Sequence, residues 1–148
     1  MAIARGSGTE IIRVIHLEDV SSAERNLIRG ARDHIYTILS IIVQCQVLGT
    51  DRNWISCRVF GYDSNGGDTG QNIHIFVQDM SVQETFVWND KFSMNGYEPT
   101  NFTGPMNDET KQDAIADQNG AIQVLNVASE NSSDRFDITC TYIDQNNE

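Results

Sequence analysis

The chain has 148 residues, with 21 acidic residues against 10 lysines and arginines, so its formal net charge at pH 7 is −11. This length is typical of one domain with one hydrophobic core. The acidic charge disfavours binding to nucleic-acid phosphates and to anionic membranes. Because Ser40, Gln44 and Gln46 interrupt the longest apolar run, that run is not a transmembrane helix.

The N-terminal residues 1–9 include Gly6, Ser7 and Gly8 and contain no apolar segment of signal-peptide length. We therefore expect a flexible arm over 1–9 and a single β-sandwich domain over 10–148, made in a cytoplasm and used there or in a particle assembled there. Residues 10–17 are expected to form the first strand. The charged segment 20–32 is expected to form either a short strand or a helical turn.

Residues 34–48 form the most informative segment, HIYTILSIIVQCQVL. Its odd positions read Ile, Thr, Leu, Ile, Val, Cys and Val, whereas His, Tyr, Ser and Gln occur at even positions. This alternation predicts one long strand with its odd-numbered side chains on a buried face. Because a typical strand has ~5–6 residues, a strand this long runs the full height of a sandwich or continues into a neighbour. We therefore expect a protein that assembles.

The three cysteines, Cys45, Cys57 and Cys140, lack metal-site spacing and are too few for a disulfide framework. A turn cluster at 49–53 separates the long strand from an expected strand at 54–60. A hairpin symmetric about Asp51 would place Cys45 opposite Cys57. The favoured interpretation is a pair of buried thiols, and a cross-strand disulfide is the alternative in an oxidising medium.

The remaining segments continue the β pattern. Further strands are expected at 72–79, 84–92, 121–129 and 135–144, with a loop at 95–107 and a polar segment at 108–118 that could form one or two helical turns. About seven or eight strands separated by turn signals are typical of an antiparallel β-sandwich or jelly roll. The fold class is therefore all-β.

No catalytic or metal-binding motif stands out. His16, His34 and His74 are dispersed without metal-ligand spacing, and no Gly-x-Ser-x-Gly motif is present. The glycine-rich turn at 61–70 offers carboxylate and amide oxygens, but its spacing does not match an EF-hand, so an ordinary solvated turn is favoured. We expect no enzyme activity, no metal and no cofactor.

Two sets of side chains are candidates for contact with other subunits. Ile11 and Ile12 follow the glycine-rich arm and are suited to strand pairing with a neighbour. Tyr97 and Phe102 lie in the 95–107 loop, where subunit contact is the favoured role and glycan binding the alternative. Trp54 and Trp88 lie within expected strands, where core packing is favoured.

Five stretches resemble small structural proteins of tailed bacteriophages, especially those that infect aquatic bacteria: RGSGTEII (5–12), ETFVWNDKF (84–92), NGYEP (95–99), FTGPM (102–106) and YIDQN (142–146). The resemblance implies a non-enzymatic virion protein, most directly a capsid decoration (cement) protein that stabilises the particle through protein–protein contacts. Such proteins are often β-sandwiches acting as homo-oligomers, commonly trimers.

The partners implied by this resemblance are further copies of the chain and the major capsid protein or other virion proteins, and the implied location is the virion. It carries over no catalytic residue. A tail, neck or fibre component is the alternative within the virion class. A carbohydrate- or receptor-binding module is the alternative from another class, and it would lose glycan binding on substitution of Tyr97 or Phe102.

Overall fold

The structure, a computed structural model, describes residues 9–61, 71–98 and 122–146, and these residues form nine strands. The strands are β1 (Thr9–Val20), β2 (Arg25–Arg29), β3 (His34–Val47), β4 (Asn53–Gly61), β5 (Gln71–Met80), β6 (Thr85–Trp88), β7 (Phe92–Asn95), β8 (Val124–Ser129) and β9 (Arg135–Asn146). The all-β prediction is confirmed, and residues 25–29 form the short strand rather than the helical turn. The polar segment at 108–118 lies outside the described residues.

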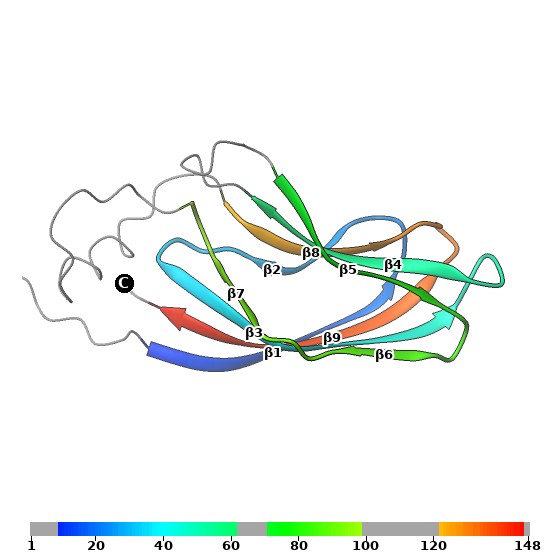
Figure 1. The fold of residues 1–148 in the computed structure, drawn as a ribbon, viewed down its shortest axis with the longest axis horizontal. Coiled ribbons are helices and arrows are strands. Elements are labelled where there is room, and N and C mark those ends of the chain that lie inside the picture. Colours follow the sequence, from blue (N-terminus) through cyan, green and yellow to red (C-terminus); the bar gives the residue numbers. More distant parts are fainter. Residues whose placement is uncertain (1–8, 62–70, 99–121, 147–148) are drawn as a thin grey trace, which may run out of the picture.

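The strands form two antiparallel sheets that pack face to face as a β-sandwich (Figure 1). The first sheet has the order β1-β9-β3-β6, with β7 also paired to β3, and the second has the order β2-β8-β4-β5. Every pair of neighbouring strands is antiparallel. The chain crosses between the sheets several times, so most neighbouring strands are far apart in sequence.

The long strand β3 contains a bulge that reverses which of its side chains face the core. Ile38 pairs with Tyr142 and Ser40 pairs with Thr141, so Leu39 is an extra residue in β3. An extra residue shifts the alternation by one position. Before the bulge the buried residues are even-numbered (Tyr36 and Ile38), and after it they are odd-numbered (Ile41, Val43 and Cys45). The predicted odd-numbered face is therefore correct only for the second half of the strand.

The segment 84–92 forms two strands, not the single strand expected. Residues Thr85–Trp88 pair with the second half of β3, and residues Phe92–Asn95 pair with its first half. The break at residues 89–91 falls opposite the β3 bulge. Phe86 and Trp88 point inward and pack on Phe76 of the opposite sheet, with ring centroids 5.0 Å and 6.0 Å apart. These aromatic contacts close one open side of the sandwich.

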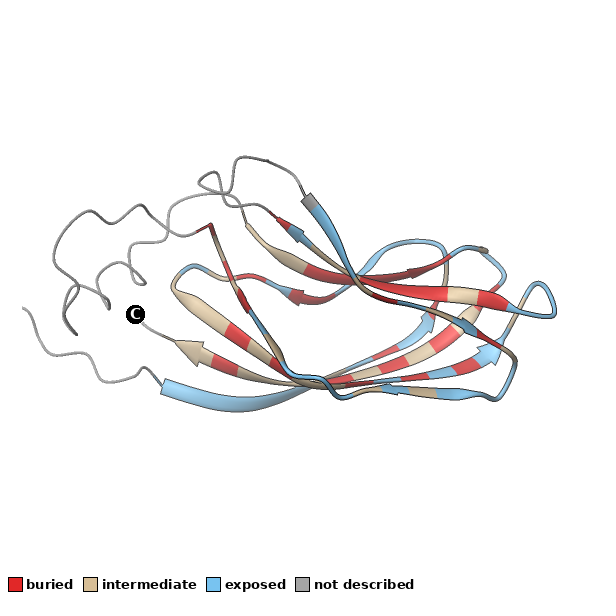
Figure 2. Ribbon diagram, viewed as in Figure 1, coloured by how far each residue is buried: buried red, intermediate tan, exposed pale blue. Residues whose placement is uncertain are grey.

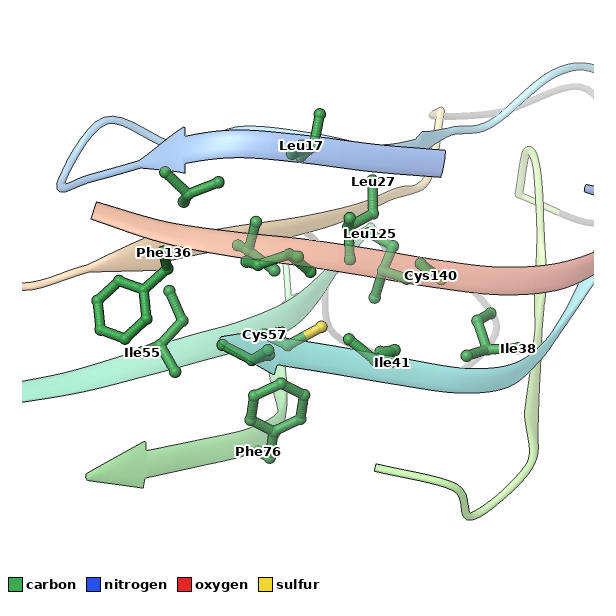
Figure 3. Close-up of a cluster of buried hydrophobic side chains, with 14 of the residues drawn as sticks. Leu17, Leu27, Ile38, Ile41, Ile55, Cys57, Phe76, Leu125, Phe136 and Cys140 are labelled. Carbon is green, nitrogen blue, oxygen red and sulfur yellow. The ribbon is translucent and has the colours of Figure 1, made fainter. Parts of the chain in front are cut away.

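The core lies between the two sheets, where buried and exposed positions alternate along the strands (Figure 2). Its fully buried side chains come from both layers and include Ile38, Ile41, Ile55, Leu125 and Phe136 (Figure 3). Burying a side chain of this size contributes about 1.5–3 kcal/mol. Trp88 packs against this cluster as predicted, but Trp54 is half-buried and lies outside it.

Two glycines allow three backbone segments to meet at one end of the sandwich. Gly30 N donates to Gln123 O, Gly96 N donates to His34 O, and Gln123 N donates to Gly96 O. A Cβ at Gly30 would lie 2.0 Å from Gly96 O, and a Cβ at Gly96 would lie 2.0 Å from Ala31 O. Only glycine permits this approach, which fixes the ends of β2, β7 and β8 relative to one another.

Candidate assembly surface

The strand β1 forms one edge of the first sheet and carries exposed apolar side chains. Within the described residues, β9 is its only strand partner, so the other side of β1 is an open edge. Ile12 and Val14 are 68% and 63% exposed, and Ile11 is 48% exposed. Ile11 and Ile12, the two contact candidates predicted from the sequence, both lie on this open edge. Val14 lies on the same face as Ile12.

A salt-bridged network fastens β1 to the rest of its sheet. Asp144 of β9 is buried, and its two carboxylate oxygens are shared between two partners. Arg13 Nε donates to Asp144 Oδ2 at 3.0 Å, and His34 Nδ1 lies 2.6 Å from Asp144 Oδ1. The His34 ring stacks on Tyr36. Burial raises the pKa of the Tyr36 and Tyr142 hydroxyls beside this network. The edge strand is therefore held by side chains as well as by its backbone ladder.

The outer face of the first sheet carries few charges across its middle. The register between β1, β9, β3, β6 and β7 aligns three cross-strand rows on this face. No Asp, Glu, Lys or Arg lies in these rows. We call them the neutral face: Ile12, Ile143, Thr37 and Ser93 in the first row; Val14, Thr141 and Ser40 in the second; His16, Thr139, Ile42 and Val87 in the third.

Each row of the neutral face also carries apolar side chains, which lie beside hydroxyl side chains and His16. Ile42 and Val87 are 41% and 50% exposed, so apolar side chains reach solvent from β1 across to β6. Exposed apolar patches rimmed by polar residues are typical of interaction sites. Val14, Ile42 and Val87 were not predicted from the sequence as contact residues. The usable signal was period-two alternation within each strand, but the neighbouring strands were unknown, so the rows could not be assembled from the sequence.

Of the two loop aromatics, Tyr97 and Phe102, only Tyr97 lies within the described residues. Tyr97 is half-buried, its backbone bridges to Ile122, and the Arg32 guanidinium lies 5.5 Å above its ring. One face of the ring is therefore occupied within the chain. Phe102 lies outside the described residues, as do the glycine-rich turn residues 62–70 and the arm over residues 1–8.

The expected hairpin that would pair Cys45 with Cys57 is wrong. β3 and β4 lie in different sheets, so Cys45 and Cys57 are not cross-strand neighbours. All three cysteines are free and buried, so Cys45 and Cys57 are buried thiols as the favoured interpretation had them, although they do not face each other. Burial raises the pKa of Cys45 to about 11 and of Cys140 to about 12, and raises that of Cys57 as well. These thiols therefore hold their protons at neutral pH, which lowers their nucleophilicity.

The three histidines are dispersed over the two sheets. His16 lies on the outer face of the first sheet with Nδ1 2.8 Å from the Thr139 hydroxyl. His34 faces Asp144 at the inner side, and His74 lies on β5 in the second sheet. Among residues 9–61, 71–98 and 122–146, no group of three or more His, Cys, Asp and Glu side chains could hold a metal ion.

A polar pocket of about 540 Å³ opens at the end of the sandwich formed by the β1–β2, β3–β4 and β8–β9 turns. Its lining consists mostly of hydroxyl and amide side chains: Ser22, Thr50, Arg52, Asn53, Glu130, Asn131 and Ser132. The buried Asp134 carboxylate links the β3–β4 and β8–β9 turns. It accepts hydrogen bonds from Gly49 N at 3.0 Å and Asn53 Nδ2 at 2.8 Å.

The described part of the chain has no helix long and apolar enough to cross a membrane.

No protein-family model matches the chain, and no curated protein matches its sequence. A chain from Bacillus endospore appendages, described as disulfide-linked pili, is 9% identical with a TM-score of 0.45, over 99% of this chain and 96% of that chain. A xylan-binding domain from Paenibacillus barcinonensis is 15% identical with a TM-score of 0.43, over 90% and 83% of the two chains. At these identities and TM-scores, neither likeness carries an argument about this chain.

Proposed function

We propose that this protein is a non-enzymatic structural subunit of a bacteriophage virion, and that it decorates and stabilises the capsid through protein–protein contacts. The observation that carries the assembly role is the neutral face together with the open β1 edge. A chain of net charge −11 repels its own copies, so an uncharged surface with exposed apolar side chains is where subunits can approach. The sequence stretches that resemble phage structural proteins support the virion location, and RGSGTEII (5–12) runs into β1 itself.

The partners in this proposal are further copies of the chain and the major capsid protein. Burial of Ile12, Val14, Ile42 and Val87 against a partner would supply the hydrophobic part of the contact. The acidic residues outside the neutral face would remain in solvent. The three buried thiols and the dispersed histidines provide no activated nucleophile in the described residues, which favours a structural role over a catalytic one.

The test is a copy-number measurement on purified particles of the phage that encodes the chain, by quantitative mass spectrometry. A decoration protein is expected at a copy number comparable to that of the major capsid protein. A copy number that is a small fraction of it would instead indicate a tail, neck or fibre component. Absence from the particles would contradict the virion assignment altogether.

The second candidate is a carbohydrate- or receptor-binding module, and the polar pocket is the observation that favours it. Hydroxyl, amide and carboxylate groups are the usual hydrogen-bond partners of sugar hydroxyls, and pockets of ~300–1,000 Å³ hold small ligands. A glycan array provides the test. Binding that is lost in Asn131→Ala but kept in Val87→Ala would support this candidate, whereas a blank array would contradict it.

A further inference from the structure

The open edges of the two sheets differ in how well they are protected against pairing with another chain. Natural sheets protect their edges with short strands, bulges or charges. β6 and β7 have four residues each. The register around β2 leaves Leu27 as an extra residue, and the register around β5 leaves Ile75 as an extra residue, so both strands are bulged. These four strands therefore offer poor templates for pairing.

β1 is the exception among the described edges. Its register with β9 is regular from Thr9 to Leu17, and its bulge comes only after Leu17, where Asp19 has a φ of 57°. Nine successive residues therefore present an unbroken backbone edge. This segment holds one acidic and one basic side chain, Glu10 and Arg13, so it is formally neutral while the chain carries −11. Two copies can approach along it with little charge repulsion.

The β1 sequence favours one antiparallel register for pairing with a second copy of itself. With a two-fold axis at Ile12, Ile12 faces Ile12 of the second copy, and Ile11 faces Arg13. Glu10 then faces Val14 and lies diagonally next to His16. An axis at Arg13 would place two arginines opposite each other, and an axis at Val14 would place Glu10 opposite Glu18. Like charges directly opposite destabilise a strand pair. Axes at Ile11 and Ile15 avoid them, but within the regular segment from Thr9 to Leu17 they pair only residues 9–13 and 13–17, whereas an axis at Ile12 pairs residues 9–15. The axis at Ile12 is therefore favoured.

We propose that β1 pairs with β1 of a second copy of this chain, antiparallel about a two-fold axis at Ile12, and that the protein is a homodimer with one continuous sheet across both copies. This inference rests on the proposed assembly role and names its partner. The pairing joins the two neutral faces on one side of the doubled sheet, because both partners present Ile12 and Val14 outward. It also shields the most exposed apolar side chain in the described residues, Ile12.

The register is tested by cysteine cross-linking of the full chain. The native thiols are buried, so an introduced surface cysteine is the one that reacts. Ile12→Cys is expected to form a disulfide-linked dimer on mild oxidation, because the two side chains face each other across the axis. Val14→Cys is the matched control. In this register the two Val14 residues are four positions apart, about 13 Å along the strand, beyond the reach of a disulfide.

The association itself is tested by light scattering over a concentration series. The wild-type chain is expected to have the mass of a dimer, and Ile12→Lys is expected to raise the dissociation constant by at least ~10-fold. Val77→Lys, on β5 of the second sheet and outside the neutral face, is expected to keep the wild-type mass. Circular dichroism of both variants shows whether they fold. Because both positions are half or more exposed, their spectra are expected to match the wild type.

Several results would overturn the dimer. These are a monomeric or trimeric wild-type mass, an Ile12→Lys variant that is folded and still dimeric, or cross-linking through Val14→Cys instead of Ile12→Cys. The copy-number measurement on particles is independent of these results. A monomeric chain found in virions would overturn the dimer and leave the proposed function standing. A dimeric chain that is absent from virions would overturn the proposed function and leave the dimer standing.

Discussion

Single buried polar residues hold the turns and the edge strand of this sandwich in place. Asp134 is fully buried and accepts hydrogen bonds from the backbone of Gly49 and Asn131 and from the Asn53 side chain. Asp144 does the same for Arg13 and His34. Buried carboxylates are tolerated only when their oxygens are paired. Each of these residues therefore connects segments that are distant in the sequence.

Asp134→Ala is expected to lower the free energy of unfolding by about 2–4 kcal/mol, because it leaves three donors at the ends of β3, β4 and β8 without their acceptor. Urea unfolding followed by tryptophan fluorescence measures this change. Glu130→Ala in the same turn is the control, since Glu130 is exposed, and its expected effect is within about 0.5 kcal/mol. A loss below about 1 kcal/mol for Asp134→Ala would contradict this role.

Because the cysteine thiols are buried, the protein is expected to lose stability as the pH rises into the alkaline range. Their pKa values are raised above 9.0, by burial, to about 11 for Cys45 and about 12 for Cys140. Above pH 9 the folded chain therefore holds more protons than the unfolded chain, so the free energy of unfolding falls as the pH rises. Each such thiol contributes up to about 1.4 kcal/mol per pH unit to this fall.

Cys140→Ala is expected to reduce this alkaline slope while costing stability at pH 7, because it removes one titrating group and leaves a small cavity. Urea unfolding at pH 8, 9 and 10 measures the slope for the variant and the wild type. An unchanged slope would show that the Cys140 thiol does not titrate differently in the two states. The tyrosines beside Asp144 are present in both proteins, so the comparison cancels their contribution.

At the scale of elements, bulges decide which faces of the strands are buried. Leu39 reverses the alternation of β3, and the break between β6 and β7 falls opposite it. Period-two patterning predicted the existence of the long strand correctly, but it assigned one face to the whole strand. The bulge was hard to find in the sequence because Ile, Leu and Val occur at both parities around it, and only Thr37 and Ser40 mark the change of parity on the outer face.

Ile38→Ala and Ile42→Ala provide a direct test of this reversal, since both replace an even-numbered isoleucine of β3. Ile38 is fully buried and Ile42 is 41% exposed. Ile38→Ala is therefore expected to cost about 2–5 kcal/mol of stability, whereas Ile42→Ala is expected to cost less than about 1 kcal/mol. Chemical denaturation of the two variants measures both costs. Equal costs would contradict the bulge, because an unbroken alternation places both residues on one face.

At the scale of the whole molecule, the distribution of charge over the surface matters more for self-association than the net charge does. The chain carries −11, yet the three rows of the neutral face contain no acidic or Lys and Arg side chain. The uncharged surface and the one long regular edge lie on the same sheet. That coincidence is what favours self-association through this sheet.

Salt is expected to strengthen the proposed dimer. Raising the ionic strength from 0.1 to 1 M shortens the Debye length from ~10 to ~3 Å, which screens the repulsion between two acidic copies while leaving the apolar contact intact. Light scattering of the wild-type chain at both ionic strengths should therefore give a lower dissociation constant at 1 M. A higher constant at 1 M would indicate that ion pairs, rather than the neutral edge, hold the copies together.

The sequence by itself determined the all-β class, the approximate strand positions and the burial of the cysteines, because alternation and turn residues act over a few neighbouring positions. The candidates Ile11 and Ile12 came from the same local information. The tertiary structure alone decided which strands are neighbours. Arg13 and Asp144 are separated by 131 positions, and strand patterning says nothing about a partner at that distance. The separation of Cys45 from Cys57 between the two sheets, the rows of the neutral face and the position of β1 at an open edge all follow from that pairing.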